Sequence, residues 1–182
     1  MFAYLGRLAR QKCVGKVIRS FREYIKSSAQ PSAQLLIIGD GPEKARLKRS
    51  VEEMKIGNCV SFLGWVSEPE TVLPAVDILL LMSRVESFPL AVIEAMSCGC
   101  AIVCDNLGDI AELTRGLEGV AVLNGRSDGH NITATFVDHY LRNKDRLRSE
   151  NRQRIIELCD QGTVYIRYLE AVDNWDLTLH TR

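Results

Sequence analysis

The 182-residue sequence has no excess of either charge, since 23 acidic side chains balance 23 lysines and arginines. A general nucleic-acid binder would carry a basic excess, so this balance disfavours that class. The sequence also lacks a run of the roughly 18 apolar residues that a membrane-spanning helix needs. Because Met1 leads almost directly into an apolar segment, no signal peptide is visible. We therefore expect a cytoplasmic protein.

The six cysteines form no C-x-x-C pair, and no nearby histidine completes the ligand spacing of a zinc site. Four of the cysteines lie in or beside apolar segments. This placement predicts buried, reduced thiols in a cytosolic protein. The four are Cys59, Cys98, Cys100 and Cys104.

Three nucleotide-binding signatures are missing as well. No G-x-G-x-x-G follows the first predicted strand, which disfavours a dinucleotide such as NAD. The sequence contains no P-loop, and it has no D-x-D pair that would hold a metal-bridged diphosphate. We therefore expect neither an organic cofactor nor a metal ion.

What the sequence does contain is an alternation of short apolar runs and helical segments. Its composition, 46% hydrophobic and 25% charged, suits a single domain over residues 1–182. The predicted strands span residues 2–5, 34–38, 59–63, 77–82, 101–104 and 119–123. The predicted helices span residues 15–27, 42–55, a short stretch after a capping box of Ser67 and Glu70, 88–98, 109–114 and most of 128–173.

This alternation predicts an α/β fold, a Rossmann-like doubly wound parallel sheet of six strands with C-terminal helices. In the usual strand order 3-2-1-4-5-6, the first and fourth strands are neighbours. The loops that follow them would place Arg7 and Lys12 beside Glu86. Two cations and the amino end of helix 88–98, all facing one crevice, favour a diphosphate site.

Glu94 is the one charged residue in the apolar helix 88–98. A carboxylate in a helix packed nearly all round needs hydrogen-bond donors, because burying it alone costs several kcal/mol. Sugar or ribose hydroxyls would supply such donors. The alternative is that Glu94 lies on the one exposed stripe of this helix, and the stretch by itself leaves both interpretations open.

Four segments, taken together, identify a protein family more specifically than any one of them does alone. They are YLGRLARQK, LLIIGDGPEKARL, VSFLGWVSE and ESFPLAVIEAMSCGCAIVCDNLGDIAEL. Over residues 2–125 they resemble the C-terminal, donor-binding lobe of retaining glycosyltransferase family 4. Those enzymes are two-lobed GT-B proteins that use nucleotide sugars in polysaccharide or glycolipid synthesis. The resemblance implies that this chain is one lobe of a GT-B fold and that a nucleotide-diphosphate sugar is its substrate.

The same resemblance assigns roles to particular residues. Glu86 and Glu94 match the two acids of the family's E-x7-E motif, with Glu86 at the donor sugar and Glu94 on the ribose hydroxyls. Arg7 and Lys12 match the basic pair that holds the diphosphate and stabilises the leaving nucleotide, so Glu86, Arg7 and Lys12 would be the catalytic residues. The remaining nucleotide contacts would be Gly39 and Gly41 by close backbone approach, Trp65 and Val66 at the base, and the amides of Phe88 and Leu90 at phosphate.

The sequence departs from the family pattern at three points. Pro89 replaces the usual glycine after Phe88 and removes one amide donor. Cys13 and Val14 stand between Lys12 and the next glycine. The N-terminal lobe, which would supply the acceptor site in cis or as a separate chain, is absent from these 182 residues.

The absent lobe leads us to expect that this chain alone binds donor but transfers sugar poorly or not at all. A lipid-linked acceptor would make the whole enzyme peripheral to the inner face of a membrane. Two alternatives remain: half of a nucleotide-sugar epimerase, and a nucleotide-sugar-binding or interaction module without catalysis.

Overall fold

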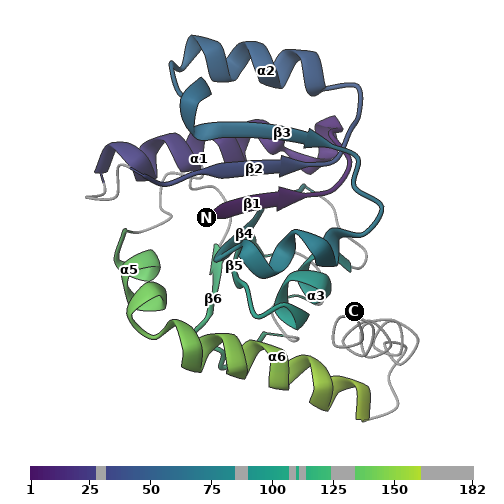
Figure 1. Ribbon diagram of the computed structural model, residues 1–182, viewed down its shortest axis with the longest axis vertical. Coiled ribbons are helices and arrows are strands. Elements are labelled where there is room, and N and C mark those ends of the chain that lie inside the picture. Colours follow the sequence, from purple (N-terminus) through teal and green to yellow (C-terminus); the bar gives the residue numbers. More distant parts are fainter. Residues whose placement is uncertain (28–31, 85–89, 107–109, 111–113, 124–133, 161–182) are drawn as a thin grey trace, which may run out of the picture.

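The computed structural model describes residues 1–27, 32–84, 90–106, 110, 114–123 and 134–160. Six parallel strands form one sheet in the order β3-β2-β1-β4-β5-β6, which confirms the predicted topology (Figure 1). The strands are β1 (Phe2–Leu5), β2 (Leu35–Ile38), β3 (Val60–Gly64), β4 (Ile78–Leu81), β5 (Ala101–Asp105) and β6 (Val120–Leu123).

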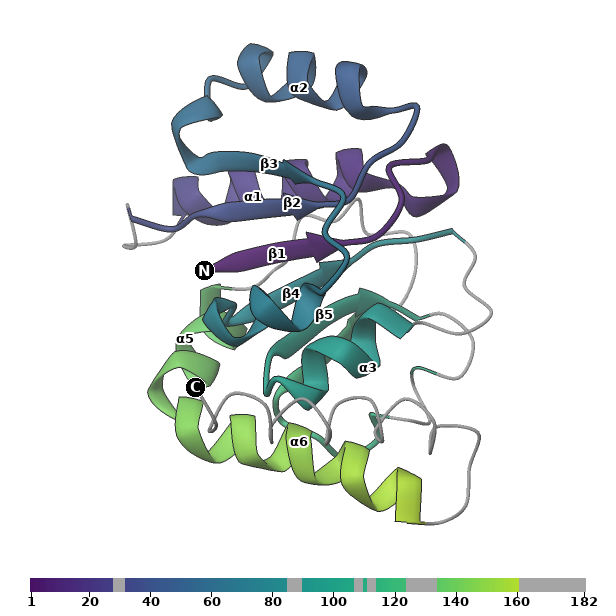
Figure 2. The ribbon, with the colours of Figure 1, turned by 45° about the vertical axis from the view of Figure 1, so that its right-hand side comes forward.

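Helices lie on both sides of this sheet. Figures 1 and 2 show α1 beside β1–β3, with α2 above them, and α3 and α6 beside β4–β6. The helices are α1 (Val14–Ser27), α2 (Lys44–Glu53), α3 (Leu90–Ser97), α5 (Ala134–Arg142) and α6 (Lys144–Asp160). Within the described ranges, no helix combines the length and the apolar character needed to cross a membrane.

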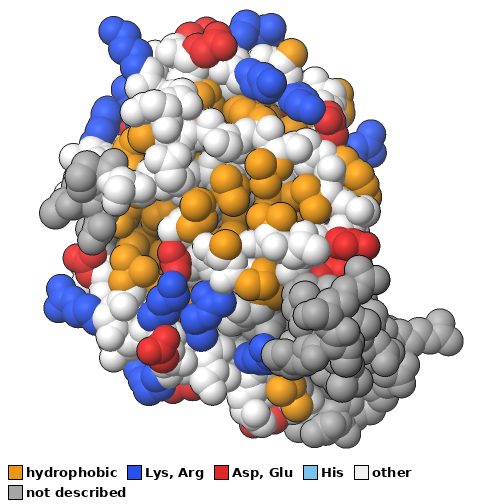
Figure 3. Space-filling model, in the orientation of Figure 1, with side chains coloured by type: hydrophobic (Ala, Val, Ile, Leu, Met, Phe, Trp, Pro, Cys, Tyr) orange, Lys and Arg blue, Asp and Glu red, His pale blue; other side chains and the backbone are white. Residues whose placement is uncertain are grey.

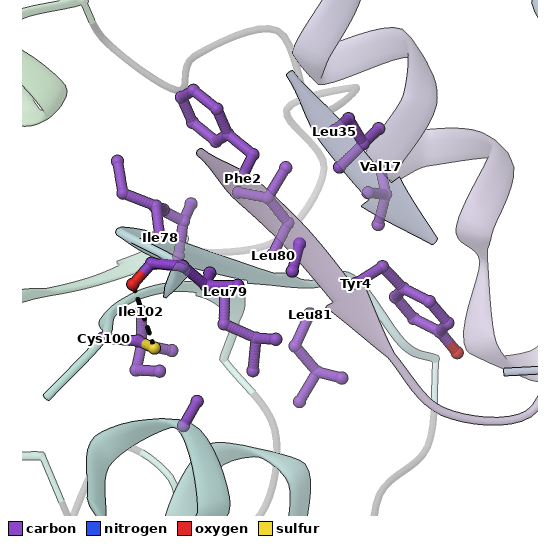
Figure 4. Packing of buried hydrophobic residues seen from close by; sticks show 14 of the residues in the cluster. Phe2, Tyr4, Val17, Leu35, Ile78, Leu79, Leu80, Leu81, Cys100 and Ile102 are labelled. Atoms are coloured by element: carbon purple, nitrogen blue, oxygen red, sulfur yellow. Dashed lines mark hydrogen bonds between the residues drawn. The ribbon is translucent and has the colours of Figure 1, made fainter. Parts of the chain in front are cut away.

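The central strands form because their side chains are buried on both faces of the sheet. All four residues of β4 are buried, as a continuous apolar run predicts. On α1 the residues at helical spacing, Val17, Ile18 and Phe21, are fully buried against the sheet. Figure 4 shows Val17 beside Leu35 of β2, with Tyr4 and the β4 side chains continuing the same core.

The predicted short helix after Ser67 is wrong. The structure has two separate 3₁₀ turns there, Pro69–Thr71 and Leu73–Ala75, and no side-chain hydrogen bond caps the first turn at Glu68. The physical reason is Pro74, which has no N–H to donate to the preceding turn and therefore breaks a continuous helix.

Other boundaries differ by one or two residues. The helix predicted from residue 42 begins at Lys44, and the strand predicted over 59–63 spans Val60–Gly64. The helical region predicted over 128–173 contains α5 and α6, separated at Asn143, while its remaining residues lie outside the described ones. Most of the helix predicted over 109–114 also lies outside them.

Side chains of α5 and α6 hold the carboxyl end of α3 in place. Arg148 donates to the carbonyl of Cys98 at 2.7 Å and to that of Val76 at 3.2 Å. Tyr140 donates to the carbonyl of Gly99 at 3.0 Å. The bonds to Cys98 and Gly99 satisfy carbonyl groups that the end of a helix leaves without partners. The bond to Val76 ties α6 to the segment before β4, so together these bonds fix α3 relative to the sheet.

Candidate functional site

A pocket of about 410 Å³ lies at the carboxyl edge of the sheet, where β1, β2, β3 and β4 end next to the amino end of α3. We call it the edge pocket. Ligands bind at this position in open parallel α/β sheets. Of the ten residues that the sequence nominated, seven line it: Arg7, Lys12, Gly39, Trp65, Val66, Leu90 and Glu94.

The two cations come from the loop that follows β1. The hydroxyl of Tyr4 donates to the carbonyl of Arg7 at 3.0 Å, and the amide of Leu8 donates to the carbonyl of Asp40 at 2.9 Å. A 3₁₀ turn, Arg10–Lys12, then brings Lys12 back to the pocket wall. Arg7 is exposed and Lys12 is partly buried, so both can meet a solvated anion.

Gly39 allows the loops after β1 and β2 to cross in direct backbone contact. Its φ is +134°, and a Cβ atom there would lie 2.0 Å from the carbonyl oxygen of Gly6. No side chain fits at that distance. Gly39 lines the pocket next to this crossing, so its close packing brings main chain to the pocket surface.

Gly41 has a different surrounding. A Cβ atom there would lie 2.5 Å from the carbonyl oxygen of Leu8, and Gly41 is not among the described residues that line the pocket. Its neighbour Asp40 accepts hydrogen bonds from Lys44 and from the amide of Gly41. Lys44, helped by that amide, holds the pKa of the Asp40 carboxyl below its ordinary value. This packing explains Gly41 structurally, and its contact with a nucleotide stays a prediction.

The α3 helix presents a single open stripe, and that stripe is a wall of the pocket. Leu90 is 44% exposed, Ala91 and Glu94 are partly buried, and the residues on the other faces of the helix are buried. The two interpretations of Glu94 therefore coincide, because the exposed stripe of the helix is also the ligand-facing surface. Leu90 and Glu94 are one turn apart and lie on the same face.

Another wall of the pocket comes from the segment after β3. Trp65 is 78% exposed, which is unusual for a residue of this size, and Val66 is partly buried beside it. Hydrophobic side chains gather across the middle of the molecular face seen in Figure 3. A pocket lined by Trp65 from one segment and by two cations from another suits a ligand that carries both a flat ring and negative charge.

Glu86 and Phe88 lie outside the described residues, as does Pro89 between Phe88 and α3. Their predicted roles therefore stay predictions. The pocket also contains residues that the sequence did not nominate: Leu5, Gly6, Ile38, Ser67, Pro69, Leu81 and Ala91. Most of them are the last residue of a strand or its immediate successor, so the strand ends alone could have identified them.

The described residues contain no group of three His, Cys, Asp or Glu side chains that could hold a metal ion. The prediction that the site works without a metal is not tested by this finding.

Three comparisons connect this geometry with known proteins. The sequence profile of the family described as glycosyl transferases group 1 matches residues 1–134. N-acetyl-alpha-D-glucosaminyl L-malate synthase of Bacillus anthracis is 32% identical over 110 residues, which cover 60% of this chain and 28% of that protein. Alpha-monoglucosyldiacylglycerol synthase of Acholeplasma laidlawii is 31% identical over 101 residues, 54% of this chain and 25% of that one.

Among solved structures, HepE of Anabaena in complex with UDP superimposes with a TM-score of 0.73. The match covers 95% of this chain and 48% of that one at 17% identity, so it shows the fold alone. The chain spans about a quarter of the length of the two curated relatives.

Proposed function

The chain belongs to the glycosyl transferases group 1 family, and from this premise we propose that it is the donor-binding, C-terminal lobe of a retaining GT-B hexosyltransferase of family 4. Residues 1–182 form one nucleotide-sugar-binding domain in this proposal. A second lobe, in cis or as a separate chain, binds the saccharide or lipid-linked acceptor. The main support for the proposal is that seven nominated residues from four separate segments line one pocket.

The pocket's charges suit a nucleoside diphosphate. Arg7 and Lys12 would bind the diphosphate, and the amide of Leu90 at the start of α3 would add a donor. The Glu94 carboxylate, one turn further along, would accept hydrogen bonds from both ribose hydroxyls. The base would lie against Trp65 and Val66, in the segment after β3.

In the transfer step, the bond between the sugar's anomeric carbon and the diphosphate oxygen breaks, and its electron pair stays on that oxygen. Arg7 and Lys12 would stabilise this developing negative charge, which is usually the largest single contribution to catalysis. The acceptor oxygen forms the new bond to the anomeric carbon, and its proton leaves with the diphosphate. Because two side-chain cations supply the countercharge, the proposed step needs no metal ion.

Calorimetric titration of the 182-residue chain with UDP, GDP and ADP in the presence of EDTA tests this proposal. UDP is the first choice because HepE was solved with it. We expect one of the three nucleotides to bind with unchanged affinity when magnesium replaces EDTA. Strict dependence on magnesium would contradict the metal-free step, and no binding of any nucleotide would contradict the donor site.

Sugar transfer is tested separately, with the nucleotide sugar of the base that binds. We expect the isolated chain to show no transfer until the acceptor lobe is supplied. Transfer by the chain alone would contradict the division of labour between two lobes.

A further inference from the structure

A second pocket, of about 490 Å³, lies on the other side of the loop that follows β1. We call it the basic pocket. Five of its eight described lining residues are arginine or lysine and one is glutamate, although the chain as a whole has no net charge. The lining residues are Arg10, Cys13, Gly15, Lys16, Arg19, Glu43, Arg46 and Arg84.

The 3₁₀ turn Arg10–Lys12 separates the two pockets. It presents Lys12 to the edge pocket and Arg10 to the basic pocket, and the two linings have no described residue in common. Cys13, directly after the turn, adopts the left-handed conformation with φ +47°, which redirects the chain into α1. The basic pocket is therefore adjacent to the proposed donor site and distinct from it.

Two guanidinium groups converge in the basic pocket above Gly15. A Cβ atom on Gly15 would lie 3.4 Å from Nη1 of Arg19 and 3.8 Å from Nη2 of Arg46. Arg19 comes from the second turn of α1, and Arg46 comes from the first turn of α2. Both helices begin at the edge of the sheet where the strand arrows end, as Figures 1 and 2 show. Like charges that meet in this way are stabilised by an anion between them.

Among the described residues, the nearby carboxylates pair with two of the five cations that line the pocket. Glu43 pairs with Arg46 at 2.5 Å, and Asp105 pairs with Lys16 at 3.6 Å. Within the described part of the chain, no ion pair is recorded for the side chains of Arg10, Arg19 or Arg84. Its described residues thus leave about three positive charges in a concave space large enough for a small anionic group.

We propose that the basic pocket is a second anion site, which binds a phosphate or phosphodiester group that does not belong to the donor nucleotide. Arginines that approach from α1, α2 and the segment after β4 suit the several terminal oxygens of a phosphate, whereas a carboxylate offers two oxygens in one plane. The phosphate can be a free ion or the headgroup of a lipid. The proposal rests on the basic pocket alone and does not depend on donor binding.

Cys13 provides a local reporter, because it lines the basic pocket and is partly buried. The experiment follows the rate at which iodoacetamide alkylates Cys13, resolved from the other cysteines by peptide mass spectrometry. We expect millimolar inorganic phosphate to slow this alkylation in the wild type, while chloride at the same ionic strength does not. Calorimetric titration with phosphate, in parallel, measures the same binding without the thiol.

Arg19→Gln removes one of the converging guanidiniums from an exposed side chain, so the fold should be preserved. We expect it to weaken phosphate binding about tenfold. Arg49→Gln, which removes the same charge from an exposed position on α2 outside the pocket, should bind phosphate like the wild type. Arg84→Gln is a second variant inside the pocket, and Arg7→Gln, in the edge pocket, should leave the protection of Cys13 unchanged.

The same variants are then tested with vesicles of phosphatidylglycerol or of phosphatidylcholine. If inorganic phosphate protects Cys13 from alkylation in the wild type but not in Arg19→Gln, the site binds a free phosphate group. If only phosphatidylglycerol vesicles protect Cys13, and Arg19→Gln again abolishes this protection, the site binds a lipid headgroup. No protection and no binding by either probe would overturn the proposal, as would equal effects of Arg19→Gln and Arg49→Gln.

Discussion

The backbone amide of Arg84 donates a hydrogen bond to the carbonyl oxygen of Gln11 at 2.8 Å. This bond joins the segment after β4 to the loop after β1, two parts of the chain that are far apart in sequence. The first segment leads to α3 and Glu94, and the second carries Arg7 and Lys12. The bond thus ties together the two elements that supply the charged groups of the edge pocket.

Lys12→Gln should weaken the contact with the diphosphate and leave the contact with the nucleoside unchanged. Because Lys12 is proposed to contact only the diphosphate, we expect the affinity for UDP to fall about tenfold. The affinity for uridine, which has no phosphate, should stay the same. Calorimetric titration with both ligands checks this, and an equal loss for UDP and uridine would place Lys12 elsewhere in the site.

Gly39→Ala should destabilise the fold. The new Cβ atom would meet the carbonyl oxygen of Gly6 at 2.0 Å, and a side chain is strained at φ +134°. We expect the free energy of unfolding in urea to fall by about 2–4 kcal/mol. Gly57→Ala is the matched control, because no described atom lies within 4 Å of its Cβ position. Similar stabilities of the two variants would contradict the backbone crossing.

Arg148→Ala should loosen α3, because it removes the donor to the carbonyl groups of Cys98 and Val76. We expect the free energy of unfolding to fall by about 1–3 kcal/mol, since the carbonyl oxygen of Cys98 loses this donor while that of Val76 keeps only the Cys100 thiol among the described donors. Arg142→Ala, at an exposed position on α5, should change it by no more than about 0.5 kcal/mol. Urea denaturation of both variants measures the difference, and a loss equal to that of Arg142→Ala would show that these bonds do not hold α3.

The buried thiols make the fold sensitive to alkaline pH. Burial raises the pKa of Cys100 and of Cys104 from 9.0 to about 12. The Cys100 thiol also donates to the carbonyl groups of Leu73 and Val76, and Figure 4 shows a hydrogen bond from this thiol. Above pH 9 the unfolded state loses protons that the folded state keeps, so the stability present below pH 9 falls as the pH rises toward 12.

We therefore expect the free energy of unfolding to decrease by up to about 1.4 kcal/mol per pH unit for each of these thiols above pH 9. Urea denaturation at about pH 8, 9 and 10 measures the slope. Cys104→Ala removes one titrating group and should make the slope shallower by that group's share. A slope unchanged by this substitution would contradict the assignment of the pH dependence to the buried thiols.

The sheet could be predicted from the sequence because its strands are buried on both faces. Such strands are continuous apolar runs, and right-handed crossover connections restrict their order. The strand order in turn predicted that Arg7 and Lys12 would lie near the amino end of the helix that contains Glu94. Most of the edge pocket follows from these two rules.

Other features could not be predicted, because they depend on contacts between distant backbone groups. The contact between Gly39 and Gly6 has no side-chain pattern, and Arg148 reaches carbonyl groups 50 and 72 residues away in the chain. The convergence of Arg19 and Arg46 likewise requires the placement of two helices. In contrast, Pro74 was visible in the sequence and could have corrected the helix predicted after Ser67.

Glu94→Ala tests the central claim, that the edge pocket binds a nucleoside diphosphate through its ribose and phosphates. The measurement is calorimetric titration of UDP, or of the base that binds best, into the wild type, Glu94→Ala and Glu52→Ala. Glu52 is an exposed carboxylate on α2, away from the pocket. We predict that the wild type and Glu52→Ala bind equally and that Glu94→Ala binds about tenfold more weakly or worse. Equal affinities of all three proteins, or no binding by the wild type, would contradict the account.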